Sequence, residues 1–254
     1  TTVQAAYASG SGTTTLIFSY TILSGQTDAN GVSIDTNSLN LNNGSITDTA
    51  GNTATLTHTA VSDNASYMVD TTVPTTTVST VLFSADTGTS GSDFVTATAA
   101  QDISGTLSAN LASGETVYVS LNNSSTWTAA TATVGQNTYS LTGQTLTSSN
   151  TLKVKITDAA GNSGTVLSQA YVLDAAVPTV SSLAITSATG ATNNTLNAGD
   201  VVIATATFTE AVTVVTTGGT PYLNLNIGGT TVQAAYASGS GTTTLIFSYT
   251  ILSG

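Results

Sequence analysis

The chain has 254 residues, of which 40% are hydrophobic and only 6% are charged, against roughly 25% charged residues in an ordinary soluble domain. The 13 acidic and 2 basic residues give a formal net charge of -11, so the molecule repels a phosphate backbone, which excludes nucleic-acid binding. Cysteine is absent, which excludes disulfides and thiolate metal sites, and no apolar run approaches the roughly 20 residues of a membrane span.

Short apolar runs rich in β-branched and aromatic residues predict strands along the whole chain. In LKVKIT the alternation puts Leu152, Val154 and Ile156 on one face and turns Lys153 and Lys155 toward water. Turn clusters rich in Gly, Asn and Ser separate the runs, and no segment has the pattern of an amphipathic helix. We therefore predict an all-β fold of antiparallel β-sandwiches. The expected strands lie, in chain order, at 15–23, 94–99, 116–121, 152–157, 201–208 and 222–227.

The sequence repeats itself. Residues 1–25 recur without a change at 230–254, 229 positions later. A shared fold does not enforce such identity, because a β-sandwich tolerates many hydrophobic sets on the same pleat, and duplication of a long unit is the simpler explanation. We expect the chain to be a window on a tandem array, an architecture used for length, spacing and multivalency.

Two shorter motifs each occur twice, in the same order. ITDTAGNT at 46–53 returns as ITDAAGNS at 156–163, and YMVDTTVPT at 67–75 returns as YVLDAAVPT at 171–179. Proline donates no ladder hydrogen bond and favours an extended predecessor, so each Val-Pro pair suits a straight crossing between domains.

Domain boundaries are therefore predicted at Pro74 and Pro178. Residues 75–178 would form a complete domain of type B. Residues 1–74 would be the C-terminal part of a type A domain, and 179–254 the N-terminal part of a further type A domain. The array then alternates two related sandwiches with the 229-residue period.

These motifs resemble the bacterial Ig-like tandem repeats of giant secreted surface adhesins, including biofilm-associated and RTX-type adhesins. The resemblance implies tandem Ig-like sandwiches in an extended array, located outside the cell at its surface. It also implies an extender role, holding an adhesive tip away from the cell, with calcium stiffening the domain junctions. The residues that carry the likeness are Asp48, Gly51, Asn52, Asp70, Pro74, Asp158 to Asn162, Asp174 and Pro178, with the segments 86–94 and 199–212.

A physical argument for calcium stands beside the resemblance. An Asp at a domain seam, with carboxylates and carbonyls from adjoining loops, offers the shell of oxygen ligands that this cation takes. Asp70 and Asp174 are the first candidates, and Asp48 and Asp158 the second, with an Asx-turn that caps a hairpin as the alternative for the second pair. Weaker candidates, or plain solvated acids, are Asp86, Asp93, Asp102, Asp200 and Glu210.

The chain offers little for catalysis, and we expect no enzyme. Its one histidine, His58, lies in a strand-like run and is expected to be an ordinary strand side chain. The carboxylate pairs Asp28 with Asp35, or Asp86 with Asp93, could in principle cleave glycosides, but nothing aromatic surrounds them to hold a sugar.

The aromatic and hydroxyl residues leave two further alternatives. Trp127 and Tyr139 flank a Thr- and Asn-rich stretch that could serve as a glycan platform, although packing in a sandwich core is the favoured interpretation. Flat Thr, Ser and Asn faces could bind polysaccharide or ice, but the Thr-x-Thr ladders are irregular. An isopeptide bond from a lysine is disfavoured by the alternation at 152–157.

The split type A domain raises the question of what completes each half, because apolar faces and strand edges would otherwise stay unpaired. The partner would be a neighbouring repeat of the same protein, or an identical chain that donates its half head to tail. The leading hypothesis is a structural extender of a bacterial adhesin or surface fibre. The alternatives are a subunit of a sheath, surface-layer or matrix filament built by strand exchange, and a polysaccharide-binding repeat.

Overall fold

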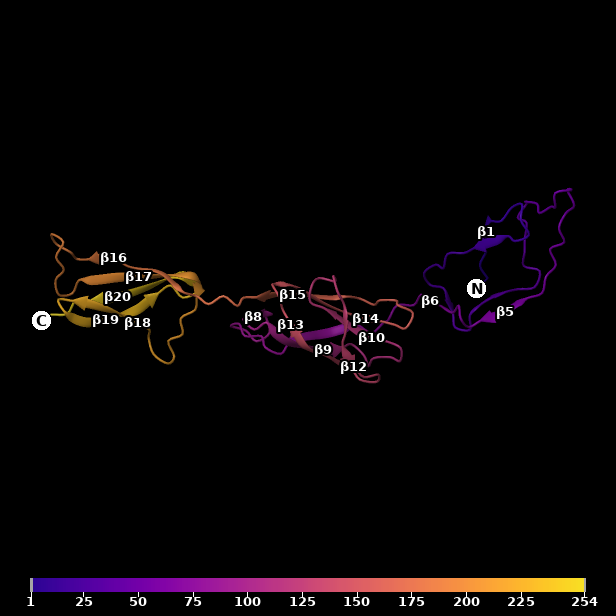
Figure 1. Ribbon diagram of the computed structural model, residues 1–254. Helices are drawn as coiled ribbons and strands as arrows, with labels where there is room; N and C mark the ends of the chain where they lie inside the picture. The colour runs from indigo at the N-terminus through magenta and orange to yellow at the C-terminus, as the bar shows by residue number, and fades with distance from the viewer. Residues whose placement is uncertain (1, 254) are drawn as a thin grey trace. The chain divides into compact units, whose positions relative to one another are not determined.

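The computed structural model describes residues 2–253, and every regular element among them is a β-strand (Figure 1). The prediction of an all-β chain is confirmed. With no helix in that part of the chain, none is long and apolar enough to cross a membrane. The chain divides into two compact units, Thr1–Ala175 and Ala176–Gly254. Pro74 lies inside the first unit, and Pro178 lies just after the division between the units. This division does not test the two predicted domain boundaries, which stay predictions.

The second half of the first unit is a two-layered β-sandwich, here called the central sandwich. Its strands are β7 (Val78–Phe83), β8 (Val95–Thr96), β9 (Ala100–Leu107), β10 (Thr116–Ser120), β11 (Thr128–Ala129), β12 (Thr131–Ala132), β13 (Thr138–Thr145), β14 (Asn150–Thr157) and β15 (Leu167–Leu173). One sheet has the order β11-β10-β14-β15-β8 and the other β12-β13-β9-β7. All pairings are antiparallel except that of β15 with β8.

The core of the central sandwich lies between its two sheets. Leu152, Val154 and Ile156 of β14 are almost fully buried, and they pack in one cluster with residues of the facing sheet such as Ile103 of β9. The alternation predicted for 152–157 is thus confirmed, with both lysines on the outer face, where they are half-exposed. Phe83 connects the cluster to Phe94 and Tyr171 through edge-to-face ring contacts, with centroids 5.0 and 5.6 Å apart.

The two aromatic residues expected in the core have different positions. Tyr139 is buried, and its hydroxyl donates a hydrogen bond to the carbonyl oxygen of Thr80 (3.0 Å). Burial raises the pKa of Tyr139, so the phenol stays protonated as a donor. The prediction for Trp127 was wrong: it is half-exposed on the outer face, and the Lys155 ammonium lies 4.7 Å from its ring centroid. Trp127 therefore makes a cation–π contact with Lys155 and is not part of the core cluster.

The second unit contains a single five-stranded sheet, here called the C-terminal sheet. Its strands are β16 (Val180–Thr189), β17 (Val201–Val212), β18 (Tyr222–Ile227), β19 (Thr230–Ser238) and β20 (Thr242–Thr250). The order is β16-β17-β20-β19-β18, all antiparallel. Its buried apolar side chains, among them Ala234, Leu245 and Phe247, share one face of the sheet.

The N-terminal segment, residues 2–74, contains only short strands. They are β1 (Ala6–Ser9), β2 (Ile17–Ser19), β3 (Thr27–Asp28), β4 (Val32–Ile34), β5 (Val61–Asn64) and β6 (Val69–Asp70). They pair as three two-stranded ribbons, β1 with β2, β3 with β6 and β4 with β5. No apolar side chain of residues 2–73 is buried. This segment has hairpins but no hydrophobic core of its own.

The two identical 25-residue copies show how neighbouring strands affect strand length and burial. In both, the turn is the same: the amide of Ser11 or Ser240 donates to the hydroxyl of a tyrosine four residues earlier at 2.8 Å. The strands differ, because the predicted 15–23 strand is reduced to the three residues of β2, whereas its second copy is the nine-residue β20. Phe18 is 39% exposed, and its equivalent Phe247 is 8% exposed.

The matched tyrosines of the repeated Tyr-x-x-Asp motif provide a test of this core assignment. Tyr171 is 4% exposed and its hydroxyl donates to the Leu121 carbonyl at 2.7 Å, whereas Tyr67 is 67% exposed. We predict that Tyr171→Ala lowers the free energy of unfolding of the central sandwich by about 3–5 kcal/mol, because it opens a core cavity. The control Tyr67→Ala should change it by less than about 0.5 kcal/mol.

Trp127 is the only tryptophan and lies in the central sandwich, so its fluorescence during urea unfolding in dilute solution follows this part of the chain. Equal losses from the two tyrosine variants would contradict the core assignment.

Candidate functional site

The chain enters and leaves the central sandwich at opposite ends of β15. Before the first strand of the sandwich, the backbone carbonyl of Asp70 accepts a hydrogen bond from the side-chain amide of Asn162 at 3.0 Å, beside the turn that precedes β15. After the last strand, the amide of Asp174 donates to the Thr96 carbonyl at 2.9 Å. The seven residues of β15 span about 20 Å between these points. Asp70 thus lies beside the turn that precedes β15, and Asp174 lies beside strand β8.

At the incoming end, Asp158 closes a tight turn between β14 and β15. Its Oδ1 accepts the amide of Asn162 at 2.8 Å, and its Oδ2 accepts the side-chain amide of Asn162 at 2.9 Å. The side-chain hydrogen bond from Asn162, as the largest cause, lowers the pKa of Asp158. Asn162 therefore fixes the turn through Asp158 and ties it to the linker through Asp70.

The sister turn at Asp48 has the same bonds. Asp48 Oδ1 accepts the amides of Ala50 and Asn52 at 2.9 and 2.8 Å, and its Oδ2 accepts the Asn52 side chain at 2.7 Å. The Asn52 side chain is again the largest cause that lowers the pKa of Asp48. This is the geometry of the Asx-turn alternative, since donors within the turn satisfy both carboxylate oxygens. A metal role for Asp48 and Asp158 stays a prediction.

At the outgoing end, residues 86–94 form a loop closed by two carboxylates. Asp86 Oδ2 accepts the amide of Phe94 at 2.9 Å, and Asp93 Oδ1 accepts the amide of Val95 at 3.0 Å. Phe94 has a positive φ of 61°, which is unusual for a bulky residue, and its ring is anchored in the core. Core packing therefore holds the loop in a conformation that its own sequence does not favour.

Asp86 Oδ1 is the one orphan atom of this loop. It is buried and has no hydrogen-bond partner among the described residues. A buried carboxylate oxygen without a donor is costly, so such an atom fits a site that a cation or a water molecule occupies. The loop 86–94 is therefore the candidate site with the strongest physical support.

The remaining candidates are scattered. Asp102 Oδ1 accepts the amide of Gly143 at 2.7 Å across a bulge between β9 and β13, and Asp200 Oδ2 accepts the amide of Asn197 at 2.6 Å. Glu210 lies in β17 of the other unit. Within residues 2–253, no three acidic or histidine side chains converge on a common point that could hold a metal. A cation at either linker would have to rely mainly on carbonyl and amide oxygens.

His58 takes part in the folding of its segment. Its Nε2 accepts the amide of Ser38 at 3.0 Å, and its Nδ1 lies 2.8 Å from the Thr59 carbonyl, so the ring holds the loop 36–38 against residue 58. These bonds require a neutral imidazole with the proton on Nδ1. The expectation of an ordinary strand side chain was wrong, because residue 58 lies outside the strands and its ring makes these cross-loop bonds instead.

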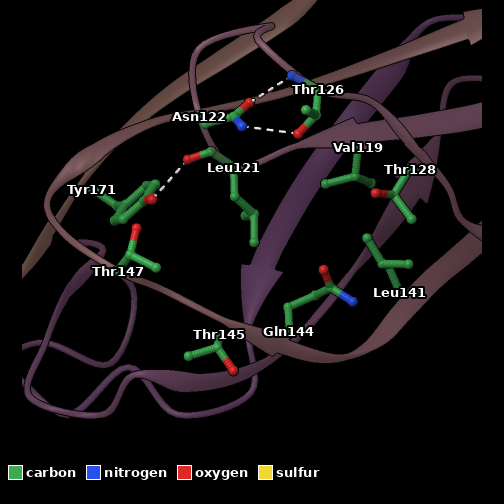
Figure 2. Close-up of a pocket in the computed structure, with 10 residues that line it drawn as sticks. All are labelled: Val119, Leu121, Asn122, Thr126, Thr128, Leu141, Gln144, Thr145, Thr147 and Tyr171. Carbon is green, nitrogen blue, oxygen red and sulfur yellow. Dashed lines mark hydrogen bonds between the residues drawn. The ribbon is translucent and has the colours of Figure 1, made fainter.

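A small pocket in the central sandwich lies between the loop after β10 and strand β13 (Figure 2). Its volume is about 220 Å³, below the range usual for ligand sites. The polar groups at its rim bond to each other, for example the Asn122 side chain with Thr126 at 2.8 Å, and Tyr171 with the Leu121 carbonyl. Tyr171 is the one aromatic residue that lines this cavity, and its hydroxyl is already bonded to the Leu121 carbonyl (Figure 2).

The fold and its loops define an Ig-like β-sandwich with polar loops at both ends. Residues 72–175 match the family model of the bacterial Ig-like domain. No curated protein and no solved structure matches the chain. The resemblance inferred from the motifs is thereby supported at the level of the Ig-like domain. The match covers the central sandwich and Asp174, and it begins two residues after Asp70.

The lowered pKa of Asp158 leads to a prediction about acid stability. The negative charge contributes stability that is complete above the unfolded-state pKa of about 4 and is lost as the pH falls through the lower folded-state value. We expect Asp158→Asn to lower the urea midpoint of Trp127 fluorescence at pH 7, with a difference from wild type that shrinks below about pH 4. The exposed Asp35→Asn should show no difference at either pH, and a constant deficit for Asp158→Asn would contradict the charge argument.

Proposed function

We propose that the chain is a structural extender segment of a bacterial surface fibre or adhesin, acting outside the cell by reach and repetition. The observation that carries the proposal is the position of the linkers at opposite ends of β15. A domain built this way adds its full length to a tandem chain. The unchanged recurrence of 25 residues at a distance of 229 supports the same role, because repetition multiplies that length.

The surface chemistry supports a role outside the cell. Hydroxyl and amide side chains take the place of the usual charged coat, and the chain carries 13 acidic residues against two lysines. An acidic, lysine-poor surface keeps neighbouring fibres apart by repulsion and offers few primary amines. Stability without disulfides then depends on core packing, ladder hydrogen bonds and bound cations.

Calcium is the cation that we propose for the outgoing end of the sandwich. Asp86 and Asp93 would hold it through their carboxylates, with backbone carbonyls of the loop 86–94 completing the shell, and Asp174 would join from the linker. At the incoming end, Asp70 is the corresponding candidate beside the Asp158 turn. A bound ion would tie the loop to the linker and so restrict bending at the junction. At a concentration 100 times its Kd, calcium adds about 2.7 kcal/mol per site.

The buried orphan oxygen leads to a direct test of the loop site. We expect millimolar calcium to raise the thermal midpoint of the central sandwich, followed through Trp127, and Asp86→Asn to abolish that rise. The matched control is Asp102→Asn, which removes an acid of the same sandwich whose carboxylate already accepts the amide of Gly143. It should lower the midpoint but keep the calcium response. An unchanged response in Asp86→Asn would remove calcium from this loop.

A second test addresses the junctions themselves. In a chain of two consecutive 229-residue repeats, we expect chelation of calcium to increase flexibility in small-angle scattering, while circular dichroism shows the same strand content. The reason is that ions at the linkers restrict bending, whereas the cores depend on apolar packing. Scattering profiles that are identical with and without calcium would contradict the stiffening role but leave the extender role intact.

A further inference from the structure

The C-terminal sheet has one apolar face, which its register defines. Ala204 pairs with Phe247 and Ala206 with Leu245, and directly paired residues point to the same side of a sheet. Leu183 pairs with Ala206 and Ile185 with Ala204, so the edge strand β16 adds its leucine and isoleucine to that face. The opposite face carries hydroxyl residues such as Thr205, Thr207 and Ser248, with Ile203 and Ile246 among them.

This apolar face is only partly covered. Leu183 is 54% and Ile185 is 69% exposed, although both lie beside buried alanines. An open groove of about 240 Å³ runs along the face, lined by Ile185, Leu196, Val202, Leu225, Ile227 and Ile251, with Asn226 as the polar member. A sheet buries such a face against a second layer, so a layer is missing from this half of the sandwich.

The central sandwich indicates what the missing layer is. Its sheet β12-β13-β9-β7 has the same arrangement as β19-β20-β17-β16, with the first strand at the edge and the second strand beside it. In the central sandwich the facing layer includes β14, the turn at Asp158 and β15. The copies of that turn and of the Tyr-x-x-Asp motif that follows it lie at 46–53 and 67–75. The counterpart of the covering layer is therefore encoded in residues 26–74.

Residues 26–74 also have the exposed apolar side chains that such a layer needs. Ile34, Val61, Tyr67 and Met68 are between 49% and 67% exposed. The same tyrosine of the motif is 4% exposed in the central sandwich, at Tyr171. In the sequence, residues 26–74 directly follow the hairpin 1–25, and an identical hairpin is already built into the C-terminal sheet as β19 and β20. Both the groove and its complement are thus present in one chain.

We propose that residues 26–74 of a second copy of this chain cover the apolar face of the C-terminal sheet, so that copies associate head to tail. A second copy is favoured over the chain's own N-terminal segment because the two linkers leave the central sandwich at opposite ends of β15. The incoming segment supplies the β14–β15 counterpart, and the hairpin 1–25 of the donor copy is left outside the sandwich. The association needs no calcium, so its test is independent of the calcium site proposed for the loop 86–94.

The test is the mass of the 254-residue chain in solution as a function of concentration. Sedimentation velocity should show masses that rise from 25.2 kDa in whole multiples. Ile185→Asp should return the chain to a monomer with the C-terminal sheet folded, because Ile185 is largely exposed there and a charge in the covered groove is costly. The matched control Ser187→Asp places the same charge two residues along β16, opposite Ile203 on the other face, and should still associate.

A second variant distinguishes the source of the covering layer. A chain in which a further copy of residues 26–74 follows Gly254 should stay monomeric and unfold at higher temperature, since the attached segment occupies the groove. A 254-residue chain that is monomeric at every concentration, or association that survives Ile185→Asp, would overturn the proposal. A monomeric 254-residue chain together with a stabilised extended chain would assign the groove to a covalently following repeat instead.

Discussion

The structure depends on one constraint, which is that an apolar sheet face must be covered by a second layer. Hairpins form from local sequence alone: the same turn and edge-to-face pair occur in Tyr7 with Phe18 and in Tyr236 with Phe247. A would-be Cβ at Gly10 or Gly239, both at φ 110°, would lie about 2 Å from a carbonyl oxygen, so both copies need the same glycine. Strand length and burial come from neighbouring strands, and only the second copy has them.

Much of the fold follows from patterns that repeat. The alternation of Leu152, Val154 and Ile156 predicts their buried face, because side chains on a strand have a period of two. Trp127 shows that residue type alone does not predict whether a side chain is buried. An aromatic residue in a sandwich is expected inside, but the lysines that alternate along β14 create an outer surface on which an indole can pack. The shortness of β2 could not be predicted either, because the length of a strand depends on the strands that pair with it, and its own sequence does not specify them.

Some features of the candidate sites were likewise predictable from the sequence, and others were not. Asp48 and Asp158 lie in matching sequences and make matching turns, so the sequence contained the Asx-turn alternative and the structure has its geometry. The role of Asn162 in tying the turn to Asp70 depends on contact across 92 positions, which no local pattern encodes. Asp86 stands out only after folding, because the orphan state of its Oδ1 results from the anchored Phe94 and the closed loop around it.

The stability of the domains and the stiffness of the junctions between them depend on different parts of the molecule. The core of the central sandwich is a cluster of buried apolar side chains that comes from both of its own sheets. The linkers are held by hydrogen bonds such as those of Asp70 with Asn162 and of Asp174 with Thr96. Bonds of this kind contribute only about 1 kcal/mol each, so junction stiffness can change without unfolding a domain. The uncovered face of the C-terminal sheet represents the opposite case, in which, as we propose, an added layer completes the fold. In the fibre that we propose, the junctions and the uncovered sheet faces are therefore the parts that can change, while the central sandwiches stay folded.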